Sequence, residues 1–278
     1  MLCAGGRSYF GVPRTPYVPG VQGVGVSGSR PVWFPTSAGM APGDGSMAEY
    51  AVVPAADLVP LPEGADPVAV AALGAVRHRR AHGADLARRA GGRGAGARAR
   101  RGRGGRPGGR PARPHRRRPP RDRGARSPAG RERAERAGAD AVVTLDTEDV
   151  AELAERFRAV AAGPVDLVLD PLFGAPAAAA ARTLRAGGRL VNLGSSAAET
   201  CPIDSATIRS RSLRLLGYTN NELAPEQRAA AMTLIAEQSA LGRLAVAYEA
   251  VPLKDAEAAW RRQADGLATG RIVLTVGE

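Results

Sequence analysis

The chain has 278 residues, a formal net charge of +12 and a pI near 11.0, and 44% of its residues are hydrophobic. This hydrophobic share supports a sizeable core and excludes a globally disordered chain, while two cysteines, Cys3 and Cys201, exclude a disulfide scaffold and a four-cysteine zinc lobe. There is no run of about 18 apolar residues for a membrane helix and no apolar signal-peptide core near Met1, so we expect a cytoplasmic protein that does not bind membranes.

The first 74 residues predict a small, irregular β domain. They are rich in Gly, Pro and Val, and their short apolar stretches lie between Gly/Pro turns. We expect strands over residues 20–26, 31–34 and 48–53. The apolar run of residues 67–73 then predicts the start of a helix.

Residues 77–126 hold all of the excess positive charge. They contain 19 arginines against two aspartates, a net charge of +17, whereas the other 228 residues have 20 basic and 25 acidic side chains and a net charge of −5. Leu86 is the only large aliphatic residue of this basic block. Its burial cannot offset a backbone entropy loss of about 1–2 kcal/mol per ordered residue, so we predict a disordered Arg/Gly-rich insert.

After the basic block, strands and helices alternate. We expect strands over residues 141–145, 165–170, 189–195, 212–218 and 272–276, and helices over residues 150–160, 176–184, 225–241 and 254–267. This alternation predicts an α/β fold with a doubly wound parallel sheet. Ligands of such folds bind beyond the carboxyl ends of the strands, which points to residues 170–173 and 193–196.

Several segments, taken in order, resemble the medium-chain dehydrogenase/reductase superfamily and within it the zinc-independent quinone oxidoreductases and enoyl reductases. The segments are residues 16–25, 45–50, 137–142, 165–170, 184–191, 252–260 and 270–274. The resemblance implies a partial GroES-like β-barrel domain over residues 1–74, a nucleotide-binding, Rossmann-like domain over residues 75–241, and a return to the first domain over residues 242–278. It also implies that the chain is truncated at its N-terminus.

The residues depart from the zinc-dependent members of that superfamily. Where those members have a His-Glu pair, this chain has Val21 and Gln22, and its only histidines, His78, His82 and His115, lie in the basic block. Catalytic zinc takes about three protein ligands. We therefore expect no metal.

The glycine loop that holds the cofactor phosphates in this superfamily would fall inside the basic block. Glycines occur at residues 91–94 and 102–105, but neither group follows an apolar strand. The length from Ala71 to Val142 nevertheless matches the family. We interpret residues 77–126 as an out-of-frame translation of GC-rich coding DNA that returns to frame near Arg126, which would leave an impaired enzyme or an inactive, degraded family member.

The resemblance implies NADPH as cofactor and hydride transfer to a quinone, an enone or a similar activated double bond of a small molecule. Without zinc, the protein would act mainly by orienting cofactor and substrate. The implied cofactor-binding residues are Arg126, Ser127, Arg131, Leu169, Asp170, Leu172, Leu193, Gly194 and Ser195, and the implied substrate pocket contains Tyr9, Tyr17 and Tyr50. A homodimer is compatible with the resemblance, and no catalytic residue is assigned.

Several of these residues have a simpler reading as well. Arg126, Ser127 and Arg131 follow the expected second strand, where a cation and a hydroxyl favour the 2′-phosphate of NADP, yet Arg131 is also spaced to pair with Glu135 on a helix surface. Asp170 is equally suited to cap a turn, and Gly194 to form a plain strand-end turn. The tyrosines could serve in packing alone.

The basic block offers a second function class. Residues 100–106 resemble an arginine-glycine tract that binds nucleic acid through phosphates. Such tracts usually interleave aromatic residues that stack on bases, and this one has none. Nucleic-acid binding is therefore the alternative to the enzyme.

Overall fold

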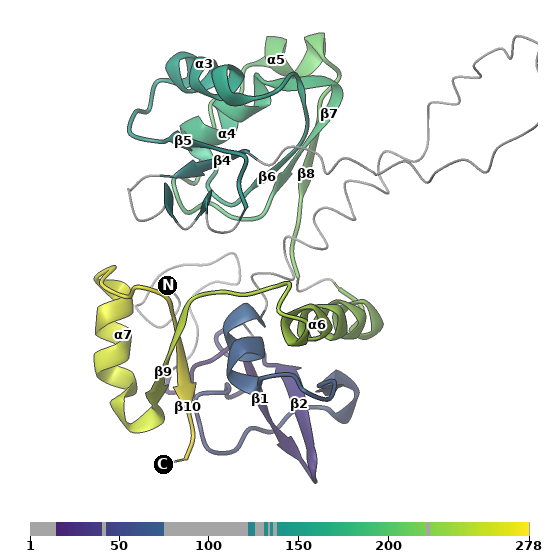
Figure 1. The fold of residues 1–278 in the computed structure, drawn as a ribbon, viewed down its shortest axis with the longest axis vertical. Coiled ribbons are helices and arrows are strands. Elements are labelled where there is room, and N and C mark those ends of the chain that lie inside the picture. Colours follow the sequence, from purple (N-terminus) through teal and green to yellow (C-terminus); the bar gives the residue numbers. More distant parts are fainter. Residues whose placement is uncertain are drawn as a thin grey trace, which may run out of the picture. The chain divides into compact units, whose positions relative to one another are not determined.

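The computed structural model describes residues 15–40, 43–74, 122–125, 131–132, 134–135, 138–220 and 223–277 (Figure 1). The chain divides into two compact units. The first unit combines Met1–His82 with Thr219–Glu278, and the second is Gly83–Tyr218. The expected insert, reading-frame change and glycine loop of the basic block lie outside the described residues, apart from residues 122–125.

The second unit is an α/β fold of parallel strands, as expected. Its described strands are β4 (Asp122–Ala125), β5 (Ala141–Thr144), β6 (Val165–Asp170), β7 (Leu184–Asn192) and β8 (Arg214–Gly217), and its described helices are α3 (Val150–Val160), α4 (Gly174–Ala181) and α5 (Ser205–Ser210). One sheet pairs β4 with β5, and the other has the order β6-β7-β8. Both are parallel throughout.

Small side chains allow α4 to sit deep in this unit. The helix reads GAPAAAAA, and seven of its eight residues are buried. One of its faces packs with α3 and β5, where Leu145, Leu153 and Ala179 form a core cluster. Another packs on β7 through Ala181 and Leu190. The alanine run is therefore a core helix, whose missing side-chain volume lets β6 and β7 approach it closely.

The structure corrects the predicted boundary between α4 and β7. The helix ends at Ala181 and the strand already begins at Leu184, not at Arg189. Val165 pairs with Leu184 but Leu167 pairs with Arg189, so β7 bulges over residues 185–188. Gly187 has φ +69° and a Cβ on Gly188 would lie 2.8 Å from the Arg185 carbonyl oxygen, so the glycine pair permits a bulge inside a strand and does not end a helix.

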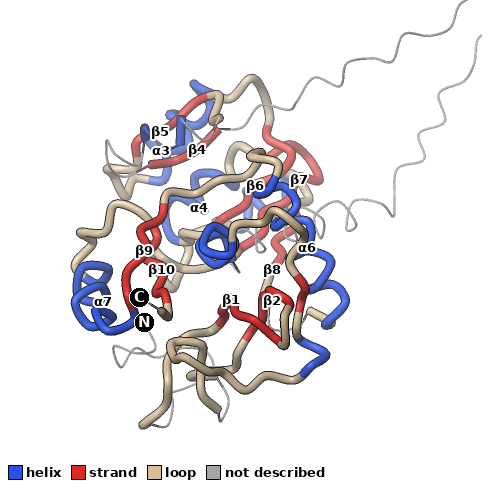
Figure 2. Tube along the Cα trace, turned by 60° about the horizontal axis from the view of Figure 1, so that its bottom comes forward, coloured by secondary structure: helices blue, strands red, loops and turns tan. Residues whose placement is uncertain are grey.

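The first unit has two described sheets. β1 (Gln22–Ser27), β2 (Arg30–Pro35) and β3 (Val59–Pro60) form an antiparallel sheet, with a short 3-10 turn, η2 (Ala55–Asp57), before β3. β9 (Tyr248–Pro252) and β10 (Arg271–Thr275) pair in parallel, connected by η3 (Leu253–Asp255) and α7 (Ala256–Ala264). Figure 2 shows β1 beside β2 and β9 beside β10. No closed barrel is present in the described residues, and the GroES-like assignment stays a prediction.

The long helix α6 (Pro225–Ala240) belongs to the first unit, not to the nucleotide-binding domain in which it was expected. Met232 and Ile235 on its buried face join Trp33, Val59 and Leu73 in one core cluster. Residues 67–74 are helical, as predicted, and contribute to the same cluster. The contact boundary between the units therefore lies at Thr219 and not near residue 241, because the apolar face of α6 is buried on β2 and β3.

The expected strand over residues 48–53 does not form. The segment reads AEYAVV and contains residues that favour strands, but no described strand pairs with it, and Tyr50 and Val52 are 89% and 100% exposed. Residue preference alone cannot satisfy the backbone N–H and C=O groups of a strand. No helix in the described part of the chain is long and apolar enough to cross a membrane.

Candidate functional site

The carboxyl ends of β6, β7 and β8 meet at one edge of the sheet. Asp170, the last residue of β6, pairs with Asn192, the last residue of β7, and Asn192 pairs with Gly217 of β8. Both segments selected from the sequence, 170–173 and 193–196, follow these strand ends. The structure thus brings together the two loops that the sequence analysis named.

Asp170 organises the turn between β6 and α4. It is 4% exposed, and its Oδ1 accepts hydrogen bonds from the backbone N–H groups of Leu172 and Phe173, both at 3.0 Å. These bonds hold Phe173 at φ +62°, an uncommon conformation for a residue with a side chain. Of the two readings of Asp170, the cap is present in the structure.

Asn192, which the sequence analysis did not select, links the strand ends. Its half-buried side-chain amide donates to Asp170 Oδ2 at 3.1 Å and to the Gly194 carbonyl oxygen at 2.9 Å. Its own carbonyl oxygen accepts from the Tyr218 N–H at 3.1 Å. Only the strand register places Asn192 beside Asp170, so no local sequence signal marks this role.

The two loops are also joined through their backbones. Leu193 N–H donates to the Asp170 carbonyl oxygen at 2.6 Å, and Ala197 N–H donates to the Leu172 carbonyl oxygen at 2.8 Å. Both the N–H and the hydroxyl of Ser196 donate to the Pro171 carbonyl oxygen, at 3.2 and 3.0 Å. The two loops, residues 170–173 and 192–197, form a rim at the carboxyl ends of β6 and β7. These hydrogen bonds organise the rim before any ligand binds.

Gly194 is not required by the packing of this rim. A Cβ at this position would lie 3.4 Å from the Pro171 carbonyl oxygen, an ordinary contact, and the backbone is not in the left-handed region. The chain itself thus leaves room for a side chain. Ser195, next to it, donates its hydroxyl to Glu199 at 2.9 Å.

The leucines named as cofactor contacts pack into the fold. Leu169 lies against the buried cluster of Val191 and Leu193. Leu172 is half-buried against the cluster that contains Leu153. Their assignment as nicotinamide contacts stays a prediction.

Arg126 and Ser127 lie outside the described residues, directly after β4, so the strand expected before them is present. Arg131 is exposed and donates to the Thr144 hydroxyl, at the carboxyl end of β5. Within the part of the chain that the structure describes, Arg131 forms no ion pair with Glu135. Arg131 therefore lies at the carboxyl end of β5, and its assignment to the 2′-phosphate stays a prediction.

The implied substrate tyrosines belong to the first unit. Tyr9 lies outside the described residues, Tyr17 is half-buried and Tyr50 is largely exposed. Their role as a substrate pocket stays a prediction.

Cys201 is a half-buried thiol that packs beside α4. It donates to the Gly174 carbonyl oxygen at 3.2 Å. Burial, and secondly the negative charge of Asp170, raise the pKa of this thiol above its ordinary value. A raised pKa lowers the share of the reactive thiolate, which disfavours a role of Cys201 as a nucleophile.

Residues 137–274 match the sequence profile of a family described as zinc-binding dehydrogenases. The match covers 138 of the 278 residues, so the chain is similar to this dehydrogenase family over about half of its length. No curated protein sequence matches the chain.

Several solved structures share the fold. E. coli K-12 YhdH with bound NADPH has a TM-score of 0.69 at 17% identity, and the match covers 95% of this chain and 84% of that one. Bacillus subtilis YhfP with NAD bound has a TM-score of 0.67 at 16% identity, covering 94% and 82%. The quinone oxidoreductase of Thermus thermophilus, solved also with NADPH, has a TM-score of 0.61 at 25% identity, covering 94% and 82%.

A doubly wound dinucleotide-binding sheet has the strand order 3-2-1-4-5-6. The described sheets agree with parts of this order, with β5 and β4 as strands 3 and 2 and with β6, β7 and β8 as strands 4, 5 and 6.

The described residues do not fit a zinc centre. Among them there is no group of three or more His, Cys, Asp or Glu side chains that could hold a metal ion. All three histidines of the chain lie outside the described ranges. The absence of zinc stays a prediction from the sequence.

Proposed function

We propose that the chain is an NADPH-dependent, zinc-independent oxidoreductase of the quinone oxidoreductase type. Its reaction would be hydride transfer to a quinone, an enone or a similar activated double bond. The observation that carries this proposal is the hydrogen-bonded rim at the carboxyl ends of β6 and β7. The chain also shares the fold of the Thermus thermophilus quinone oxidoreductase, at 25% sequence identity. NADPH supplies the hydride when it is bound.

The rim supports binding of a flat nicotinamide ring. Asp170 and Asn192 fix the two loops, because the Asn192 amide donates to both the Asp170 carboxylate and the Gly194 carbonyl oxygen. The surrounding residues leave room for a Cβ at Gly194. Close approach of a ligand to the backbone would explain why a glycine stands at this position. Arg131 at the end of β5 would take the 2′-phosphate, which favours NADP over NAD.

The absence of zinc ligands sets the way in which this site would work. Val21 and Gln22 replace the His-Glu pair of zinc members. The chain would then accelerate the reaction by holding two reactants in one geometry, not by polarising a carbonyl group with a metal.

We further propose that the chain as it stands binds NADPH weakly. Residues 77–121 provide no Val-rich strand followed by a glycine loop, and backbone N–H groups of that loop make the main contacts to the pyrophosphate. The nucleic-acid alternative rests on the same residues alone, and similarity to a dehydrogenase family favours the enzyme.

Titration of NADPH fluorescence tests the binding proposal. We expect a Kd weaker than about 100 μM for this chain, since loss of the loop contacts removes several kcal/mol of roughly 8 kcal/mol that micromolar binding needs. A micromolar Kd would contradict the proposed impairment.

A repaired chain tests the activity. Residues 77–126 are replaced by the alternative reading frame of the coding DNA, and NADPH oxidation is measured with and without a benzoquinone. We expect micromolar NADPH binding and quinone-dependent turnover. If neither frame encodes an apolar strand followed by a glycine loop, the frame interpretation is wrong; if the repaired chain binds no NADPH, the oxidoreductase proposal is wrong.

A further inference from the structure

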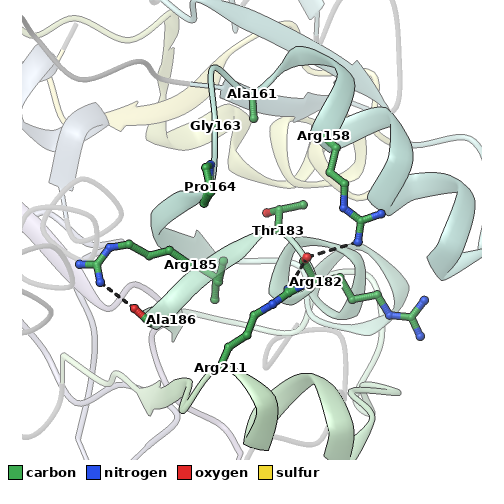
Figure 3. Close-up of a pocket in the computed structure, with 10 residues that line it drawn as sticks. Arg158, Ala161, Gly163, Pro164, Arg182, Thr183, Arg185, Ala186 and Arg211 are labelled. Atoms are coloured by element: carbon green, nitrogen blue, oxygen red, sulfur yellow. Dashed lines mark hydrogen bonds between the residues drawn. The ribbon is translucent and has the colours of Figure 1, made fainter.

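A second hollow lies at the opposite, amino-terminal ends of β6 and β7. It has a volume of about 560 Å³, and its only charged lining residues are four arginines (Figure 3). Arg158 comes from α3, Arg182 follows α4, Arg185 lies in the bulge of β7 and Arg211 follows α5. All four arginines line the hollow, which lies at the end of the strands opposite the rim. The guanidinium groups of Arg158 and Arg211 meet at the Arg182 carbonyl oxygen, whereas that of Arg185 donates to the Ala186 carbonyl oxygen at 2.7 Å (Figure 3).

One of these arginines is committed to the fold. Arg182 donates to Asp204 Oδ2 at 3.2 Å. Asp204 is in turn fixed by hydrogen bonds from the Thr207 N–H and hydroxyl at 2.7 and 2.8 Å, as the cap of α5. Arg182 is therefore a fixed side of the hollow.

The other three arginines can turn to a ligand at small cost. Arg158 pairs with Glu155 and Arg185 pairs with Asp166, and both carboxylates are largely exposed to water. Exposed ion pairs contribute little to stability. Arg211 has no carboxylate partner among the described residues.

Capping of α4 explains only part of this cluster. Arg211 Nη1 donates to the Arg182 carbonyl oxygen at 2.5 Å, and Arg158 Nη2 approaches the same oxygen at 3.4 Å (Figure 3). A guanidinium has five N–H donors, so this contact leaves most donors of Arg211 available. Arg185 does not contact this oxygen at all.

The bulge of β7 places Arg185 beside Arg211. The N–H of Gly187 donates to the Arg211 carbonyl oxygen at 2.7 Å, which ties the bulge to the segment after α5. Arg185 lies in the bulge, between the paired residues Leu184 and Arg189, and has no partner of its own in the register of β6 and β7. The backbone therefore holds two unrelated loops, each with an arginine, against each other.

We propose that this hollow binds a small molecule that carries two or more phosphate groups. Its volume lies within the range of about 300–1,000 Å³ found for small-molecule sites. The planar guanidinium fork binds phosphate oxygens in pairs, and the hollow presents several forks with no carboxylate in its lining. Pyrophosphate is the simplest ligand of this class.

Residue-resolved chemical protection tests the proposal in the full chain. Arginines are modified with phenylglyoxal at physiological salt, with and without pyrophosphate, and each modified peptide is quantified by mass spectrometry. We expect Arg158, Arg185 and Arg211 to react at least fivefold more slowly with pyrophosphate present. Arg261, an exposed and paired arginine of α7, is the control and should react at an unchanged rate.

The reaction rate must be measured for each arginine separately, because the basic block of residues 77–126 also attracts phosphates. The double variant Arg185→Gln/Arg211→Gln should abolish the protection of Arg158, whereas Arg261→Gln should preserve it. Circular dichroism shows whether each variant is folded. If the double variant does not fold, the protection rates of Arg158, Arg185 and Arg211 in the unmodified chain test the site alone. Unchanged rates at Arg185 and Arg211, or protection confined to residues 77–126, would overturn the site, and equal protection by citrate would overturn the assignment to phosphate.

Discussion

Asp170 and Asn192 join the ends of two parallel strands by a side-chain hydrogen bond of 3.1 Å. The bond lies at the end of the register in which β6 and β7 pair. The same Asn192 amide also donates to the Gly194 carbonyl oxygen at 2.9 Å. One side chain thus adds to the backbone hydrogen bonds that join the two loops of the rim.

Replacing Asn192 by Leu should destabilise the protein. Asp170 Oδ2 then loses its donor while the residue is almost fully buried, and an unsatisfied buried acceptor costs about 1–3 kcal/mol. Urea unfolding followed by circular dichroism measures the loss. Ser195→Ala is the control, because its hydroxyl pairs with an exposed Glu199; equal stability of Asn192→Leu and the unmodified chain would contradict this role.

Substitution of two glycines should separate ligand approach from packing. Gly194→Ala should change the free energy of unfolding by less than about 0.5 kcal/mol, as expected of a site without steric conflict, yet weaken NADPH binding roughly tenfold. Gly188→Ala should destabilise the fold, because its Cβ would lie 2.8 Å from the Arg185 carbonyl oxygen. Urea unfolding measures the stability of both variants, and NADPH titration of the repaired chain with Gly194→Ala measures the loss of affinity. Unchanged NADPH affinity in Gly194→Ala would remove Gly194 from the cofactor site.

The ion pair between Arg228 and Asp57 should contribute more than the surface pairs. It joins α6 to η2 at 2.6 Å, with side chains only 21% and 24% exposed. We expect a coupling energy of about 1–2 kcal/mol in a double-mutant cycle of Arg228→Gln and Asp57→Asn. The exposed Arg261–Glu257 pair of α7, treated in the same way, should give about 0.3–0.5 kcal/mol; equal couplings would show that burial is irrelevant here.

The cap of α3 should make stability depend on acid pH. The backbone N–H groups of Glu152 and Ala151 donate to Asp149 and hold its pKa below the ordinary value of 3.8. A carboxylate with a lowered native pKa stabilises the fold above its unfolded pKa, and the benefit disappears as the pH falls through the native value. Asp149→Ala should therefore melt at a lower temperature at pH 7, and the difference should shrink below about pH 4.

Thermal melts of both proteins from pH 7 to pH 3 measure this dependence. Asp149→Asn is the matched variant, since an amide oxygen still caps the helix but does not titrate. It should keep most of the stability at pH 7 and show no such dependence on pH. A difference that is independent of pH would indicate that the charge of Asp149 does not contribute.

Local signals in the sequence were sufficient for the elements with clear boundaries. β6 was predicted with the observed bounds, because an apolar run ends at a carboxylate, and α6 was predicted to within one residue, because Pro225 stands at its first turn. β9 was missed and residues 48–53 were wrongly assigned a strand, because pairing with a distant segment decides both outcomes.

The candidate site was predictable to the level of loops but not of contacts. The loops that follow β6 and β7 could be selected from periodicity and topology alone. The part played by Asn192 depends on which residue lies opposite Asp170, and the bulge of β7 changes that register. The arginine hollow at the other end of the strands likewise gathers residues from four elements, and no single stretch of sequence marks it.

The membership of α6 in the first unit determines the order in which the chain can fold during synthesis. Trp33 and Val59 leave the ribosome early, but Met232 and Ile235, which complete their cluster, emerge only after the whole second unit has been made. Domains generally fold as units, in the order in which they are completed. The core around Trp33 can therefore be completed only after the second unit has been synthesised.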